Sequence, residues 1–112
     1  MTEDREQFTS GAVRQRLDDV RFDLVSPQGL RRLAETYAYG AHKYDDHNWR
    51  KGMPFSSLMN HLVAHIYAYL AGDKEEDHLA HASWGLFALM EFEETRPELN
   101  DLWSARGKGE GA

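Results

Sequence analysis

Apolar residues recur at steps of three and four positions in three stretches of the chain, a spacing that places them on one side of an α-helix. The stretches cover about 27–42, 54–72 and 74–95. Ser26 is a good helix cap, and the proline that follows it suits a first turn. The sequence therefore predicts three helices, with a short fourth helix after Pro97. The apolar stripes consist of Leu30, Leu33, Ala34, Tyr37 and Ala41 in the first helix, Phe55, Leu58, Leu62, Ile66 and Tyr69 in the second, and Leu79, Ala82, Leu86, Leu89 and Met90 in the third.

This pattern indicates an all-α fold, an antiparallel bundle of three to four helices. No alternation typical of β-strands stands out. The second and third helices are joined by a short connection at 71–74 that contains Gly72, and short connections make antiparallel neighbours. Helices of this number and size bury only a thin core. We therefore expect a second copy of the chain to complete the bundle, in a homodimer or a higher homo-oligomer.

The chain divides into three parts. Residues 1–25 lack helical periodicity and are expected to form an irregular arm, with Phe22, Leu24 and Val25 docked on the body of the protein. Residues 26–104 form a single all-α domain. Residues 105–112 are rich in glycine and are expected to form a flexible tail.

Charge and composition exclude several classes of protein. The chain has 13 Lys and Arg against 19 Asp and Glu, a net charge of −6, and the whole excess lies in residues 53–112. Binding to a nucleic-acid polymer or to an anionic membrane requires a basic face and is not expected. The chain has no cysteine, which excludes disulfides, thiolate metal ligands and a cysteine nucleophile. No apolar run is long enough to span a membrane, and the acidic start differs from a secretory signal, so we expect a cytoplasmic protein.

The six histidines are concentrated between His42 and His81, beside the acidic segment. His61 and His65 are four residues apart in the second predicted helix, and Asp77 and His81 are four apart in the third. In an antiparallel pair these positions lie at matching levels, so we expect His65, Asp77 and His81 to converge. Such a group can carry acid–base or metal chemistry. The alternative is a buried polar network, in which the histidines are hydrogen-bonded and hold no metal.

Three carboxylates near this group are candidate metal ligands. Glu35 lies in the first helix, and Glu76 and Asp77 lie near the start of the third. A site that mixes carboxylates with imidazoles and has no thiolate favours Mg²⁺ or Mn²⁺ over zinc. For Glu35 the alternative is an ordinary solvated carboxylate on a helix.

The polar loop that follows the first helix has the residue types that bind a nucleotide. Lys43, Arg50 and Lys51 can contact phosphate oxygens, Asn48 can pair with the edge of a base, and Trp49 can stack on its face. The alternatives are scattered surface charge for the cations and, for the tryptophan, a cover over the end of the helical hairpin.

Four segments of the chain resemble the dATP/dGTP diphosphohydrolase N-terminal domain family, which is associated with phages. They occur in the family's order and cover most of residues 11–95, with departures at Ala64, where arginine is expected, and at Gly85, where asparagine is expected. The family is similar to the MazG-like all-α pyrophosphohydrolases. The segments are GAVRQ (11–15), RFDLVSPQGLRRLAETYAYGAHKY (21–44), NWRKGMP (48–54) and HIYAYLAGDKEEDHLAHASWGLFAL (65–89).

The resemblance implies an enzyme that converts dATP or dGTP, as purine deoxynucleoside triphosphates, to the monophosphate and pyrophosphate with Mg²⁺ or Mn²⁺. Glu35, Glu76 and Asp77 would then hold the ion, and His65 and His81 would act as ligands or as the base. Two alternatives stay open. One is a protein that binds nucleotide without turnover, and the other is a purely structural helical oligomer in a phage context.

Overall fold

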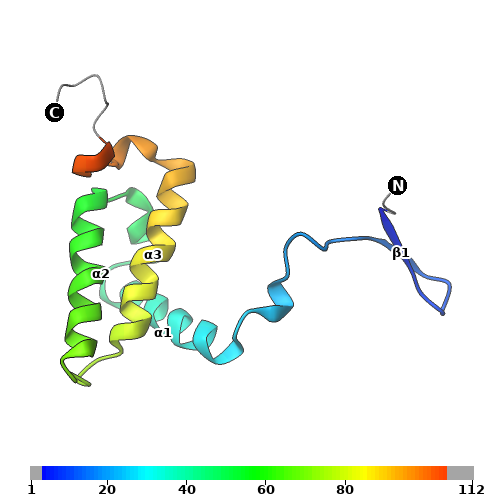
Figure 1. The fold of residues 1–112 in the computed structure, drawn as a ribbon, viewed down its shortest axis with the longest axis horizontal. Helices are drawn as coiled ribbons and strands as arrows, with labels where there is room; N and C mark the ends of the chain where they lie inside the picture. Colours follow the sequence, from blue (N-terminus) through cyan, green and yellow to red (C-terminus); the bar gives the residue numbers. More distant parts are fainter. Residues whose placement is uncertain (1–3, 106–112) are drawn as a thin grey trace.

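The structure is a computed structural model that describes residues 4–105, and it confirms the all-α class (Figure 1). The predicted tail at 105–112 lies outside the described residues, apart from Ala105. The three long helices end within a few residues of their predicted bounds. They are α1 (Pro27–Lys43), α2 (Phe55–Leu70) and α3 (His78–Thr95), accompanied by the short 3-10 turns η1 (Phe22–Leu24), η2 (Asn48–Lys51), η3 (Pro97–Leu99) and η4 (Trp103–Ala105).

Helices α2 and α3 form the predicted antiparallel hairpin, and α1 runs across it and packs on α3 (Figure 1). Gly72 forms the turn between α2 and α3. Its φ of +90° is costly for residues with a side chain, and its N–H donates to the carbonyl of Tyr69. The glycine therefore ends α2 and reverses the chain.

The core of the hairpin has its largest side chains at the end away from this turn. Phe92 is 1% exposed, and its ring centroid lies 5.9 Å from that of Trp49 and 6.5 Å from that of Phe55. Near the middle of the hairpin, Gly85 lets the two helices approach closely, because a Cβ atom there would lie only 3.0 Å from Cβ of Leu62. The buried core consists of Phe55, Leu58, Leu62, Ala82, Ala88, Leu89 and Phe92.

The predicted apolar stripe of α3 is only partly right. Ala82 and Leu89 are buried as expected, but Leu79, Leu86 and Met90 are 43–54% exposed. Small residues such as Ala80, Gly85 and Ala88 face the neighbouring helices in their place. The cause is that α3 is apolar on all sides, so periodicity does not select one face. No helix within residues 4–105 is both long and apolar enough to cross a membrane.

Helix α3 begins four residues later than predicted. Asp77 is its N-cap, because the Asp77 carboxylate accepts a hydrogen bond from the N–H of Ala80 at 3.1 Å. Asp73, which is also of a residue type that caps helices, instead accepts the N–H of Glu75 at 2.8 Å in the turn before the helix. Both aspartates are good capping residues, and the sequence does not show which of them is used.

The N-terminal arm is not irregular throughout, which corrects the prediction. Strands β1 (Arg5–Gln7) and β2 (Val13–Gln15) pair antiparallel, and this hairpin stands away from the helices (Figure 1). Phe22 and Leu24 do not dock on the body, since they are 75% and 70% exposed. The radius of gyration is 19.3 Å, whereas about 13 Å is typical of a compact chain of this length. The arm is therefore an extended projection of the described chain.

The loop between α1 and α2 is held in place from both sides. Gly52, with a φ of +99°, packs so tightly that a Cβ atom there would lie 2.6 Å from Cδ1 of Leu99. The carbonyl of Lys51 accepts a hydrogen bond from Arg96 at 3.0 Å. Trp49 inserts its ring between Tyr37 and Phe92, with a centroid distance of 5.9 Å to each. These contacts fix the segment that carries the candidate nucleotide-binding residues.

Candidate functional site

A cleft of about 940 Å³ lies between the C-terminal half of α1, the loop that follows it, and the facing sides of α2 and α3. Its volume is in the range of small-molecule sites. Two of the predicted catalytic residues line this cleft, His65 and His81, and so do all five predicted substrate-binding residues, which are Lys43, Asn48, Trp49, Arg50 and Lys51. The cleft thus brings the predicted phosphate-binding and catalytic groups together.

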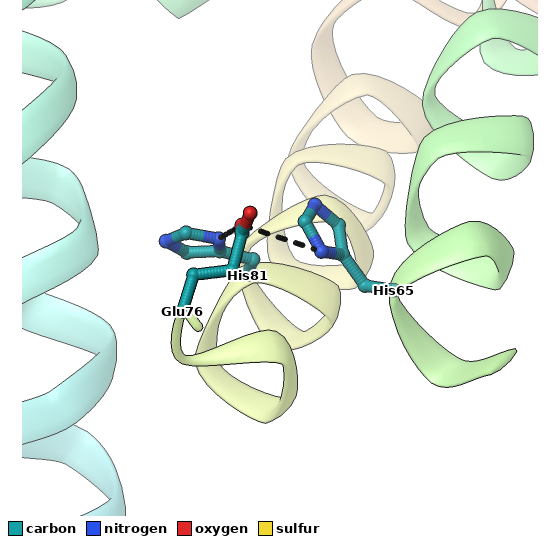
Figure 2. Close-up of side chains that lie close together, drawn as sticks. All are labelled: His65, Glu76 and His81. Atoms are coloured by element: carbon teal, nitrogen blue, oxygen red, sulfur yellow. Dashed lines mark hydrogen bonds and ion pairs between the residues drawn. The ribbon is translucent and has the colours of Figure 1, made fainter. Parts of the chain in front are cut away.

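At one end of the hairpin, three side chains converge (Figure 2). Glu76 Oε1 lies 2.8 Å from Nδ1 of His81 and 3.7 Å from Nδ1 of His65. The two imidazole rings are 5.1 Å apart between centroids. His65 comes from α2, His81 from the first turn of α3, and Glu76 from the turn that precedes α3. The hairpin therefore brings the two histidines together as predicted, with Glu76 as the carboxylate between them.

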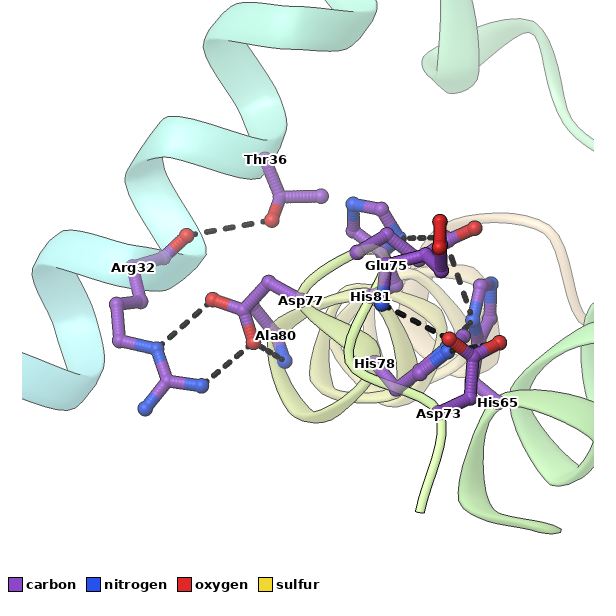
Figure 3. Close-up of polar contacts among 10 residues, drawn as sticks. Arg32, Thr36, His65, Asp73, Glu75, Asp77, His78, Ala80 and His81 are labelled. Atoms are coloured by element: carbon purple, nitrogen blue, oxygen red, sulfur yellow. Dashed lines mark hydrogen bonds and ion pairs between the residues drawn. The ribbon is translucent and has the colours of Figure 1, made fainter. Parts of the chain in front are cut away.

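His78 also belongs to this group, although it was not among the residues predicted for it. Its side chain is 5% exposed, and its Nδ1 lies 2.9 Å from Nδ1 of His65. On the other side of the ring, Nε2 of His78 lies 3.3 Å from a carboxylate oxygen of Asp73 (Figure 3). The available signal was the spacing of three between His78 and His81, which puts both on one side of a helix.

The surroundings of His65 favour its neutral imidazole form. Burial and the neighbouring His81 lower the pKa of His65. The pKa of Asp73 is also lowered, first by the N–H of Glu75 and then by His78. A neutral imidazole has a lone pair that can bind a metal ion or accept a proton. The group is thus equipped for either role.

Asp77 does not join the histidines, which corrects the predicted convergence. Its two carboxylate oxygens accept hydrogen bonds from Arg32 of α1, at 2.8 Å and 2.5 Å (Figure 3). This pairing lowers the pKa of Asp77 to about 2. The carboxylate thus caps α3 and joins it to α1. Its neighbour Glu76 lies among the imidazoles instead.

Glu35 also lies apart from the histidines. It pairs with Arg31 one turn earlier on α1, at 3.5 Å, and its side chain is 63% exposed. This is the arrangement expected of a solvated helix carboxylate, the alternative drawn from the sequence. Among the described residues, the group whose ligand atoms all lie within 4.8 Å of one another consists of His65, Glu76 and His81.

The loop residues of the cleft are partly engaged with one another. The guanidinium of Arg50 lies 4.5 Å from the centre of the Trp49 ring and donates to Glu91 at 3.2 Å and to His47 at 2.8 Å. Lys43 lies near the rings of two tyrosines at the end of α1. Trp49 is packed on the core, as the covering role predicts, and it also lines the cleft. Trp49 therefore has the covering role, and the stacking of its ring on a base stays a prediction.

A protein-family model described as "dATP/dGTP diphosphohydrolase, N-terminal" matches residues 10–102 of the chain. The matched part includes all three helices, the loop between α1 and α2, and every residue of the histidine group. The chain belongs to this family. No curated protein and no solved structure matches it.

Membership of the dATP/dGTP diphosphohydrolase N-terminal family points to a diphosphohydrolase with a nucleotide substrate. The structure also explains why glycine, and not the expected asparagine, stands at position 85. In this member of the family, the close approach of Leu62 leaves no room at that position for a larger side chain without a shift of the helices.

Proposed function

We propose that the protein hydrolyses purine deoxynucleoside triphosphates, dATP or dGTP, to the monophosphate and pyrophosphate. The observation that carries the proposal is the cleft, which places His65 and His81 on the same cavity as the loop cations and Trp49. The family description supports the choice of substrate. Cations suit the triphosphate, an aromatic ring suits the base, and imidazoles suit proton transfer.

In the proposed reaction, a water oxygen bonds to the α-phosphorus, and the bond from that phosphorus to the α–β bridging oxygen breaks. Pyrophosphate leaves with the bridging oxygen, and the proton of the water passes to a base. His65 and His81 are the candidates for this base, or they serve as metal ligands instead. Arg50 and Lys51 hold the phosphate chain, and Trp49 with Asn48 contacts the base of the nucleotide.

Mg²⁺ or Mn²⁺ is the proposed cofactor, and its chemistry would be to neutralise phosphate charge and to activate the water. The residues that would hold it are His65, Glu76 and His81. Two imidazoles and one carboxylate suit Mn²⁺, whereas Mg²⁺ prefers sites made of oxygen atoms alone. Within the proposed cofactor pair, this donor set favours Mn²⁺.

The test is a screen of all eight common deoxyribo- and ribonucleoside triphosphates with Mg²⁺ or Mn²⁺, in which both products are identified. We expect pyrophosphate and the monophosphate from dATP or dGTP. Arg50→Ala should raise KM at least about 10-fold, because a charged phosphate contact is lost. Release of inorganic phosphate and a diphosphate, or no turnover with any ion, would contradict the proposal.

We also propose that the active form is a homo-oligomer. On α3, Leu86, Phe87 and Met90 are 46–54% exposed, whereas other residues of α3 pack against α1 and α2. An apolar surface of this kind is best covered by a second copy. Light scattering at micromolar concentration should give at least twice the chain mass, and Leu86→Lys should lower it. A monomer under these conditions would contradict the proposal.

A further inference from the structure

We propose that the histidine end of the hairpin is a binding site for first-row transition-metal dications, Mn²⁺ as well as Zn²⁺ and Co²⁺, and that it discriminates against Mg²⁺. The ligands are His65, Glu76 and His81, and His78 lies beside them in contact with His65. The inference deepens the proposed function and rests on it for the catalytic role of the ion, whereas the binding itself is independent of any nucleotide.

The spacing of the donor atoms supports a single ion. Ligands about 2.1 Å from a metal ion lie roughly 3.0–3.5 Å from one another. The distances from Glu76 Oε1, 2.8 Å to Nδ1 of His81 and 3.7 Å to Nδ1 of His65, lie on either side of that range. All three ligand atoms lie within 4.8 Å of one another, so small rotations of the side chains are enough to close the site.

His78 supports the proposed metal site independently of the spacing of the donor atoms. It is 95% buried, since its exposed fraction is 5%, and its Nδ1 faces the group at 2.9 Å from His65. Asp73 lies 3.3 Å from Nε2 of His78 without a hydrogen bond in the structure, and because a carboxylate is only an acceptor, in the proposed site it would take the ring hydrogen of Nε2 and leave the lone pair on Nδ1. A carboxylate behind a ligating histidine is the usual way to fix the orientation of the ring.

The chemistry of the donors selects the ion. Imidazole nitrogen binds late first-row dications strongly, whereas Mg²⁺ takes oxygen ligands and gives up its water reluctantly. Two imidazoles and one carboxylate, with the His78 imidazole beside them, therefore make a site for a transition metal. The charge of Glu76 offsets part of the charge of the ion, and His65 and His81 open toward the cleft in which the triphosphate is proposed to lie.

A metal-free polar network is the competing interpretation, because each imidazole already has a hydrogen-bonding neighbour. The two interpretations differ at Glu76. Its side chain is about half exposed, so glutamine there keeps the fold and most of the hydrogen bonding but removes the negative charge. A metal site loses affinity through this change, whereas a network holds no metal to lose.

The experiment is calorimetric titration of the metal-stripped full chain with Zn²⁺, Co²⁺ and Mg²⁺, without nucleotide. We expect about one Zn²⁺ or Co²⁺ per chain, with Mg²⁺ bound at least about 100-fold more weakly. Glu76→Gln, His65→Asn and His81→Asn should each weaken Zn²⁺ binding at least about 10-fold. Circular dichroism of each variant shows that it is folded.

His42→Asn is the matched control, because His42 is exposed on α1 and lies outside the group and the cleft. It should leave Zn²⁺ affinity unchanged. The inference is overturned if the wild type binds neither Zn²⁺ nor Co²⁺, if Mg²⁺ binds as tightly as they do, or if Glu76→Gln changes nothing. Tight Zn²⁺ binding by a protein that hydrolyses no nucleotide would contradict only the proposed function.

Discussion

The two ends of the α2–α3 hairpin differ in chemical character, since one is apolar and the other is polar. At the end where α2 begins and α3 finishes, Phe55 and Phe92 are almost completely buried among other apolar side chains. At the turn end, the same two helices meet through His65, His78 and His81. Apolar burial stabilises a fold, whereas polar groups held together inside one cost free energy unless they are fully paired.

The difference indicates that the two ends of the hairpin have different roles. The apolar end supplies the stability that keeps the helices in register, and the turn end uses that register to bring groups from α2 and α3 together. Substitutions at the two ends should therefore have different consequences. Those at the apolar end change mainly the free energy of unfolding, and those at the turn end change mainly binding and turnover.

The largest effect on stability is expected at the apolar end. Phe92→Ala should lower the free energy of unfolding by about 3–5 kcal/mol, because it removes a buried ring and leaves a cavity. Chemical denaturation measures the change. Phe22→Ala is the matched control in the arm, where the side chain is 75% exposed, and it should stay within about 0.5 kcal/mol of the wild type. Equal effects of the two substitutions would refute the assignment of the core.

A smaller loss is expected midway along the hairpin. Gly85→Ala places a methyl group 3.0 Å from Leu62 Cβ, and such overpacking costs roughly 1–3 kcal/mol, less the gain in helix propensity. Leu62→Ala keeps the Cβ atom but removes Cδ2, which would lie 3.1 Å from the new methyl group, so it should relieve part of the clash. The double variant should therefore be more stable than the sum of the two single effects predicts. Additive effects in denaturation would mean that the helices do not meet at this point.

The smallest effect on stability is expected where α1 joins the turn end. Asp77→Ala removes the cap of α3 and its pairing with Arg32, and we expect a loss of about 1 kcal/mol. Asp77→Asn can still cap the helix but cannot pair as a charge, so it should lose less. A double-substitution cycle with Arg32→Met isolates the pairing, and a coupling of zero would refute it.

The same pairing has a defined dependence on pH. The pKa of Asp77 is lowered from 3.8 to about 2 in the folded protein, so the folded state resists protonation of this group. Its contribution to stability is complete above the unfolded pKa and is lost as the pH falls from about 4 toward 2. The difference in stability between wild type and Asp77→Asn should therefore shrink over that range. A constant difference would show that the charge of Asp77 does not stabilise the fold.

The helices could be predicted from the sequence because their signals are local. Ser26 caps α1, accepting the N–H of Gly29 at 3.0 Å, and Gly72 ends the α2 segment, as their residue types indicate. The antiparallel register then brought His65 and His81 together. The strands of the arm were harder to predict, because β1 and β2 have three residues each and are too short for an alternating pattern to be visible.

The sequence did not show which of two neighbouring carboxylates lies among the histidines. Glu76 and Asp77 are adjacent, and a shift of one residue at the start of a helix turns a side chain by about 100°. Their roles follow from where α3 begins and from the guanidinium of Arg32, which reaches Asp77 across 45 positions of sequence. The position of His78 in the group likewise depends on α3 starting at that residue, and its spacing of three from His81 was the one signal for it in the sequence.

The most direct test of the division between the two ends is the release of pyrophosphate from dATP or dGTP by wild type and Glu76→Gln, with the free energy of unfolding measured on the same samples. The account predicts that turnover falls at least about 10-fold while stability stays within about 0.5 kcal/mol. Unchanged turnover, or a loss of activity that merely follows a loss of stability, would contradict it.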